Sequence, residues 1–163
     1  MRNKSCAWRY RSVIAAVAFA ATSSAAQSVP GPQWEGRADV FLASTTTVQG
    51  AAAVAFFLDP SFRLVALGGA GSTLASGVGE FSARFDLLGR YVLDPDRKEQ
   101  WALYGTGGLS LRYEAAPSWR GALVALVGLE GPKWGSWTPF VEAGYGGGVQ
   151  IGLGLRRATV RGR

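Results

Sequence analysis

The amino-acid sequence predicts an all-β protein: an eight-stranded antiparallel up-and-down transmembrane β-barrel that follows an N-terminal signal peptide. Three observations support this prediction. One long segment alternates between apolar and charged positions, turn signals recur at an even spacing, and tryptophans gather at the ends of the predicted strands. After the predicted signal, no apolar run has the length of a membrane-spanning helix. A closed barrel is the other structure that satisfies every backbone hydrogen bond within a bilayer.

Residues 1–26 have the features of an export signal. An apolar run covers residues 13–21, and Ser24-Ala25-Ala26 forms a small-residue cleavage site. The basic segment before the run contains Arg2, Lys4, Arg9 and Arg11. A membrane anchor is the alternative, but the run is shorter than the roughly 20 residues that a spanning helix needs. We expect residues 1–26 to be removed and residues 27–163 to form one domain in the cell outer membrane.

The composition excludes several function classes. The chain has 17 basic and 11 acidic residues, and four of the basic residues lie in the predicted signal, so residues 27–163 carry 13 minus 11, or +2. This small excess gives no reason to expect nucleic-acid binding. The chain has no histidine, and its one cysteine, Cys6, precedes the apolar run. We therefore predict no enzymatic activity, no cofactor, no metal site of the usual zinc type and no disulfide.

The most informative segment covers residues 80–93, with the sequence EFSARFDLLGRYVL. Successive side chains of a strand point to opposite faces, so the segment has one apolar face and one charged face. Fourteen residues exceed the usual strand length of about five or six and suffice to cross a bilayer, which takes roughly 9–11 tilted residues. We expect Phe81, Phe85 and Tyr91 to face lipid.

Three turn signals divide the chain at an even spacing. Leu58, Leu93 and Leu129 are 35 and 36 residues apart, and each precedes a proline-containing turn. The turns contain Asp59-Pro60, Asp94-Pro95 and Gly131-Pro132, which favour chain reversal. This period corresponds to one strand, one loop and one further strand. The sequence therefore predicts three similar short turns on one side of a sheet.

These turns place eight strands along the chain. The predicted strands cover residues 34–44, 48–58, 62–70, 80–93, 100–113, 119–129, 137–145 and 149–160. A Thr-rich turn at residues 45–47 joins the first two strands. Eight strands of roughly ten residues match the strand length of a small transmembrane barrel.

The strands differ in how clearly they alternate. The first and seventh alternate moderately, the fifth and eighth clearly, and the second consists almost wholly of Ala, Val and Phe. The third begins after the first turn and ends in glycines. The sixth is apolar on both faces, so a short buried helix stays an alternative there. The length of that segment and Gly128 favour a strand.

Aromatic residues mark the predicted strand ends. Rings with a polar edge favour the membrane–water interface, so transmembrane barrels carry aromatic girdles at both ends of their strands. A soluble barrel with aromatic plugs at its ends is the alternative. The predicted girdle consists of Trp34, Tyr91, Trp101, Trp119, Trp134 and Trp137, with Tyr113 and Tyr145 similarly placed.

The charged face of the long strand is the candidate site. We expect it to point inward and to form a polar network with charges from neighbouring strands, since an unpaired charge in a poorly hydrated interior is costly. The network could be a gated polar path, a small-ligand site or a salt-bridged plug. The plug is favoured, because eight strands enclose little more than their own side chains. Its predicted members are Arg37, Asp39, Glu80, Arg84, Asp86, Arg90, Arg112 and Glu142.

Two motifs near the end of the chain are typical of a known class. Residues 139–146 read PFVEAGYG, and residues 152–156 read GLGLR. With them, residues 27–163 resemble small outer-membrane β-barrel proteins, the class of the OmpA membrane domain and OmpX. The resemblance implies both termini in the periplasm, a structural or narrow-pore role, and outer-membrane lipid and the barrel-assembly machinery as partners. The expected oligomeric state is a monomer.

Two other functions stay open on the sequence alone. A soluble, exported, lipocalin-like barrel would turn the apolar faces inward around an apolar ligand. A surface adhesin would need binding loops on the outer side, but the candidate loops near Thr45 and at residues 70–79, 114–118 and 146–148 are short. Barrels of the resembled class that modify lipid A use a catalytic histidine, which this chain lacks.

Overall fold

The computed structural model describes residues 31–75, 78–95, 101–114 and 118–158. The predicted signal peptide, residues 1–26, lies outside the described residues. The strands are β1 (Gln33–Leu42), β2 (Thr46–Phe57), β3 (Phe62–Ala75), β4 (Val78–Val92), β5 (Ala102–Glu114), β6 (Ser118–Glu130), β7 (Trp137–Tyr145) and β8 (Val149–Ala158). In this part of the chain, no helix is long and apolar enough to cross a membrane.

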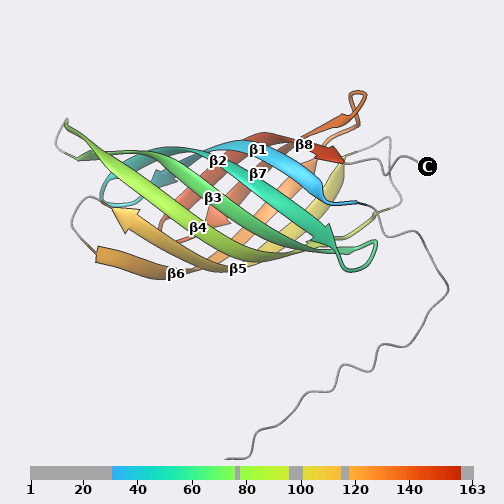
Figure 1. Cartoon of the computed structure of the whole chain (residues 1–163), viewed down its shortest axis with the longest axis horizontal. Coiled ribbons are helices and arrows are strands. Elements are labelled where there is room, and N and C mark those ends of the chain that lie inside the picture. Colours follow the sequence, from blue (N-terminus) through green and yellow to red (C-terminus); the bar gives the residue numbers. More distant parts are fainter. Residues whose placement is uncertain (1–30, 76–77, 96–100, 115–117, 159–163) are drawn as a thin grey trace, which may run out of the picture.

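The eight strands form one closed antiparallel barrel in sequence order (Figure 1). Each strand pairs with the next along the chain, and β1 closes the barrel on β8, from the Gln33–Ala158 pair to the Leu42–Val149 pair. Closure leaves no unpaired sheet edge. The predicted eight-stranded up-and-down barrel is thereby confirmed.

The barrel has two distinct ends. The end that holds the start of β1 and the end of β8, together with the connections after β2, β4 and β6, is here called the terminal end. The three predicted proline turns lie there. In the first turn, the Asp59 carboxylate accepts hydrogen bonds of 2.7 Å from the backbone N–H groups of Ser61 and Phe62. The opposite end, here called the loop end, carries the four remaining hairpin connections.

The structure corrects two predicted segments and resolves one alternative. Residues 70–75 and 78–79 are not loop but strand, because β3 continues to Ala75 and β4 begins at Val78. Thr46 and Thr47 belong to β2 rather than to a turn. The sixth segment is a strand over Ser118–Glu130 and not a short helix, although both of its faces are largely apolar.

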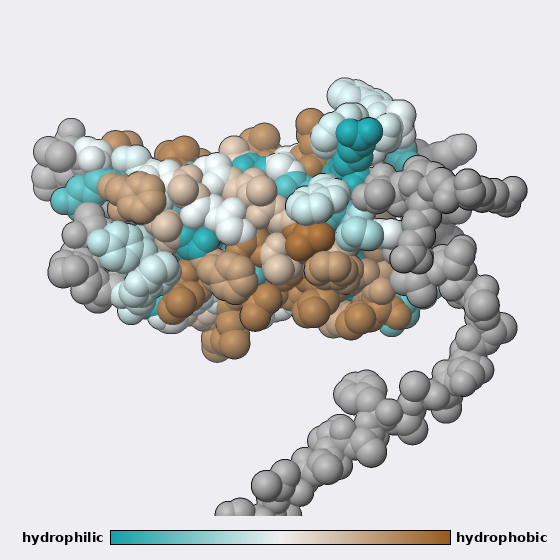
Figure 2. Space-filling model, in the orientation of Figure 1, coloured by the Kyte–Doolittle hydropathy of each residue, from teal (hydrophilic) through white to brown (hydrophobic). Residues whose placement is uncertain are grey.

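The faces of the strands separate sharply. On β4, Phe85 is 49% exposed and Leu87 is 50% exposed, whereas Arg84, Asp86 and Arg90 are buried inside. The apolar face of this strand therefore points outward. Apolar residues cover much of the middle of the barrel wall in Figure 2.

Candidate functional site: the barrel interior

The interior holds a dense set of charged side chains that the strands project inward. Six arginines and four carboxylates are buried there, and Glu130 is half-buried at the terminal end. The arginines are Arg37, Arg63, Arg84, Arg90, Arg112 and Arg156, and the carboxylates are Glu35, Asp39, Asp86, Glu130 and Glu142. Buried charges are tolerated in proteins where they are paired and hydrogen-bonded.

Glu142 on β7 is one centre of this network. Its Oε2 lies 2.6 Å from Nη1 of Arg37, and its Oε1 lies 3.4 Å from Nη2 of both Arg90 and Arg156. The hydroxyl of Tyr104 donates a hydrogen bond of 2.8 Å to the same Oε1. One carboxylate thus joins side chains from β1, β4, β5 and β8 across the barrel.

Asp39 on β1 is a second centre, nearer the loop end. Arg37, two residues away on the same face, donates to it at 2.6 Å. Arg84 of β4 also donates to Asp39, and Gln150 of β8 donates at 3.2 Å. Arg84 further lies 3.7 Å from the carboxylate of Asp86, which accepts a 2.6 Å hydrogen bond from Ser110.

Glu35 and Glu130 complete the network toward the terminal end. Arg90 donates two hydrogen bonds to Glu35, and Nε of Arg156 lies 3.1 Å from the same carboxylate. Glu130 lies 2.8 Å from Arg156 and 3.1 Å from Arg63. Arg156 therefore links Glu35, Glu130 and Glu142.

Aromatic rings stack against the arginines. The guanidinium of Arg156 lies 3.9 Å from the ring centroid of Phe140 and 4.6 Å from that of Tyr104. The guanidiniums of Arg84 and Arg112 lie 4.8 Å and 3.8 Å from the Phe41 ring. Such contacts attract the cation to the ring face and also fill space in the interior.

Glycine makes room for these large side chains. A Cβ at Gly152 of β8 would lie 2.3 Å from Oδ1 of Asp39 and 2.5 Å from Nη2 of Arg37. The space that a side chain would fill here is occupied by the Arg37–Asp39 pair. The glycines of the GLGLR motif thus have a packing role next to the network.

An apolar cluster fills another part of the interior. It is formed by inward-facing residues of β2, β3, β4 and β6, whose side chains are almost wholly buried. Its members are Ala53, Ala55, Val65, Leu67, Leu88, Val124 and Leu126. The interior is therefore packed by a charged network on one side and by aliphatic side chains on the other.

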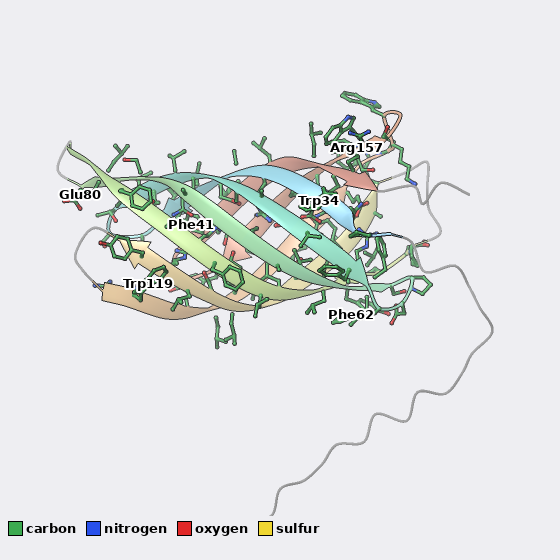
Figure 3. All side chains as sticks on the ribbon, viewed as in Figure 1. Trp34, Phe41, Phe62, Glu80, Trp119 and Arg157 are labelled. Carbon is green, nitrogen blue, oxygen red and sulfur yellow. The ribbon has the colours of Figure 1, made fainter. Side chains whose placement is uncertain are left out.

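The structure brings seven of the eight predicted interior residues together. Arg37, Asp39, Arg84, Asp86, Arg90, Arg112 and Glu142 are buried inside the barrel. Glu80 is not part of the buried network, and its prediction is corrected here. It lies at the loop-end rim of β4, near the left end of Figure 3, and its side chain is exposed because the strand outruns the packed interior.

The structure adds five members to the predicted network: Glu35, Arg63, Tyr104, Glu130 and Arg156. Glu35 and Arg156 alternate in step with Arg37 and Gln150, so the period of two could have found them. Glu130 was part of the predicted turn at Gly131-Pro132. It lies two residues after Gly128, however, and therefore on the same face of β6. Tyr104 alternates in step with Thr106, Ser110 and Arg112, so the period of two also places it on the inward face.

The six residues of the predicted girdle lie on the outer surface near the barrel ends. Trp34, Tyr91 and Trp101, together with Trp134 and Trp137, are exposed at the terminal end. Trp119 is exposed at the loop end, where its ring centroid lies 5.5 Å from that of Tyr113. Figure 3 shows Trp34 and Trp119 at opposite ends of the barrel.

The arrangement pairs the buried charges across the barrel. In the described residues, no group of three or more His, Cys, Asp or Glu side chains could hold a metal ion. The buried carboxylates described above each contact at least one arginine or hydroxyl group. Such a network crosslinks the strands through the centre of the barrel.

Comparison with known proteins identifies the fold. No protein-family model and no curated protein sequence matches the chain. Among solved structures, the chain is similar to the de novo designed protein TMB2.3, with a TM-score of 0.54 and 18% identity over 83% of this chain and 99% of that one. It is also similar to Neisserial surface protein A, with a TM-score of 0.57 and 12% identity over 78% of this chain and 96% of that one. The chain thus has the fold of these small barrels.

Proposed function

We propose that this protein is a non-enzymatic integral barrel of the outer membrane with a closed interior and a structural role in the cell envelope. The proposal includes export through residues 1–26, insertion by the barrel-assembly machinery, and a monomer surrounded by outer-membrane lipid. The similarity to a neisserial surface protein is consistent with this location.

One observation carries the proposal: the charges are inside and the apolar side chains are outside. Among the outward-facing strand positions with described side chains, Arg157 at the end of β8 is the one charged residue. A protein in water buries its apolar side chains and exposes its charges, whereas the lipid-facing wall of a transmembrane barrel is apolar. The wall of this barrel follows the second pattern.

The height of the apolar wall fits a bilayer. Tyr91 and Phe81 lie ten residues apart on the outer face of β4, near opposite ends of the barrel. At about 3.3 Å per residue and a tilt of about 40°, this separation spans about 25 Å along the barrel axis, close to the apolar band of outer-membrane barrels. Ala83, Phe85 and Leu87 lie between them.

The packed interior supports a closed barrel over a narrow pore. The network around Glu142 and the stacked rings of Tyr104 and Phe140 cross the interior and join β1, β4, β5, β7 and β8. An ion crossing this layer would have to displace buried ion pairs that join four strands. We therefore favour a salt-bridged plug over a conducting path.

The structure gives less support to a lipocalin-like barrel and to a surface adhesin. A lipocalin-like barrel would turn Phe81, Phe85 and Tyr91 inward, but these side chains are 49–62% exposed on the outer face. The predicted outer loop at residues 70–79, a candidate adhesin surface, is instead mainly strand.

Membrane extraction tests the proposal. The protein should stay in the pellet when isolated outer membranes are washed with alkaline carbonate, because it is held by its apolar wall. A periplasmic marker protein should be released in the same wash. Release of the mature protein into the supernatant would overturn the membrane location.

A further inference from the structure

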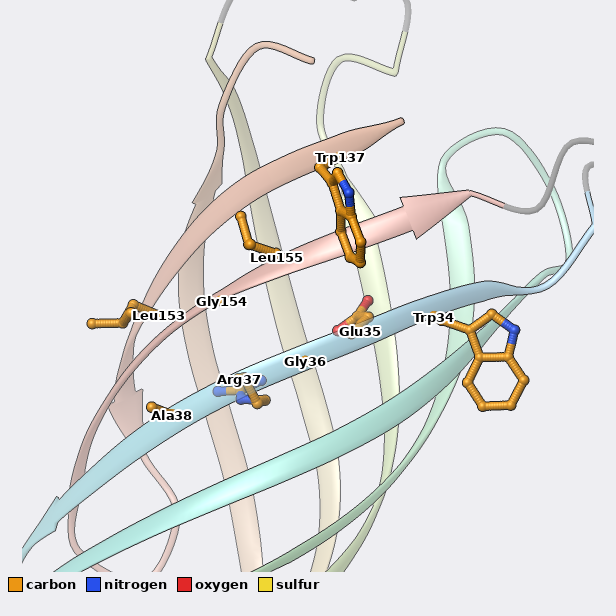
Figure 4. Close-up of a pocket in the computed structure, with 9 residues that line it drawn as sticks. All are labelled: Trp34, Glu35, Gly36, Arg37, Ala38, Trp137, Leu153, Gly154 and Leu155. Atoms are coloured by element: carbon orange, nitrogen blue, oxygen red, sulfur yellow. The ribbon is translucent and has the colours of Figure 1, made fainter. Parts of the chain in front are cut away.

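The outer wall carries an apolar groove at the junction of β1 and β8. Its sides are formed by Trp34, Trp137 and the ridge of Leu153 and Leu155, as Figure 4 shows. Small residues form its floor, because Gly36 and Ala38 are the outward-facing residues of β1 there. The space over Gly36 is open: a Cβ at this position would meet no other atom within 4 Å.

A cation lies next to the two tryptophans of the groove. Arg157 of β8 pairs in register with Trp34 of β1 on one side and with Trp137 of β7 on the other. The three residues form one row at the terminal end, and the Arg157 guanidinium lies 5.6 Å from the Trp137 ring centroid. Arg157 is exposed and forms no ion pair with the described residues, whereas its neighbour Arg156 points inward and forms ion pairs with three carboxylates.

From this geometry we infer that the groove binds one anionic phospholipid. The phosphate pairs with Arg157 between the two tryptophans, and one acyl chain lies over Gly36 and Ala38 against the leucine ridge. An arginine at the edge of an apolar surface suits a phosphate, because the guanidinium donates several hydrogen bonds to its oxygens. The inference rests on the proposed function, since it places the terminal end at the surface of a bilayer.

Charge favours a lipid over a second copy of the chain. The outward strand positions with described side chains carry no carboxylate, so a second barrel packed wall to wall would bring no counter-charge to Arg157. An anionic phospholipid supplies both the counter-charge and the apolar chain.

Lipid retention tests the inference. The refolded protein in detergent micelles is titrated with phosphatidylglycerol or with phosphatidylcholine of the same acyl chains, and native mass spectrometry measures the fraction that carries one lipid. We expect one retained phosphatidylglycerol and weaker retention of phosphatidylcholine. Arg157→Gln should weaken phosphatidylglycerol retention by about fivefold, the effect expected of one basic residue near an anionic lipid surface.

Groove filling tests the site of the acyl chain. Gly36→Leu should reduce retention of both lipids, because the new side chain occupies the groove. Gly121→Leu is the matched control: it is an outward glycine of β6 with open space around it, away from the groove. This control should retain lipid as the wild type does.

Four outcomes would overturn the inference: unchanged retention in Arg157→Gln, equal effects of Gly36→Leu and Gly121→Leu, displacement of the lipid by excess inorganic phosphate, or a dimer that Gly36→Leu abolishes. Carbonate extraction of each variant from vesicles distinguishes failure of the proposed function from failure of the lipid site alone. If the wild type is extracted, the proposed function fails. If every variant resists extraction and retention is unchanged, only the lipid site fails.

Discussion

At the scale of single residues, Glu142 contributes most to the interior. It contacts Arg37, Arg90 and Arg156 and accepts a hydrogen bond from Tyr104. Removing a carboxylate from such a site leaves buried cations without their counter-charge, which costs more than the pair itself contributes. Glu80 on β4 is a carboxylate of the same type at an exposed rim, where little depends on it.

We expect Glu142→Ala to lower the free energy of unfolding by about 3–5 kcal/mol, because three buried arginines lose a shared partner. Glu80→Ala should change it by no more than about 0.5 kcal/mol. Urea unfolding of the two variants in lipid vesicles measures both effects. Equal stability of the two variants would show that the interior charges do not crosslink the strands.

At the scale of strands, one close approach fixes the pairing of β6 with β7. Gly144 faces Leu126 across this pair, and a Cβ at Gly144 would lie 2.2 Å from the backbone oxygen of Ala125. A backbone atom cannot move aside as a side chain can. Any larger residue at this position must therefore push the two strands apart.

Gly144→Ala should thus destabilise the barrel by about 1–3 kcal/mol through overpacking. Gly121→Ala, an outward position with open space, is the matched control and should keep the wild-type stability. Thermal unfolding followed by circular dichroism compares the two. A Gly144→Ala variant as stable as the control would contradict the close strand packing.

The orientation of β4 predicts that the cost of an outward-facing charge depends on its depth in the bilayer. Phe85→Arg places a charge on the outer face in the middle of the strand and should cost about 2–4 kcal/mol if that face meets lipid, whereas Tyr91→Arg at the end of the same face should cost about 0–1 kcal/mol. Denaturant titration of both variants in vesicles measures the difference. A barrel that tolerates Phe85→Arg but collapses on Arg84→Leu would contradict the orientation.

The strands were more predictable than the contacts inside them. Alternation over residues 80–93 identifies the faces of β4 correctly, because a period of two is a local property of the chain. The bounds of the seventh strand were also predicted as Trp137–Tyr145. The end of β3 was missed, since glycines and small residues that suggest a loop continue the strand to Ala75. The ion-pair partners in the network, such as Arg90 and Glu35, depend on the register of several strands. The local sequence pattern does not determine that register, so these pairs could not be predicted.

At the scale of the whole molecule, the barrel reverses the arrangement of a protein in water. An apolar wall about 25 Å high surrounds a charged, packed centre, and the aromatic residues lie near the two ends. The apolar wall, the packed centre and the aromatic ends each have a separate physical cause. All three fit a barrel that is surrounded by a bilayer. The packed centre is the part that decides between a plug and a pore.

We expect no stable conductance steps from the refolded protein in a planar lipid bilayer, because the Arg–Glu network and its stacked rings fill the interior. A porin inserted into the same membrane serves as the positive control. Reproducible single-channel openings from the wild type would replace the plug with a narrow pore.

In the proposed orientation, the outer face of β4 meets lipid. The chain has one cysteine, Cys6, in the predicted signal, so single spin labels can be placed at successive positions 83–88 of the refolded mature protein in vesicles. Collision with oxygen, which partitions into lipid, and with a water-soluble nickel complex is then measured by electron paramagnetic resonance. We expect labels at Ala83, Phe85 and Leu87 to collide often with oxygen and rarely with nickel. Frequent collision with nickel at these three positions would contradict this orientation.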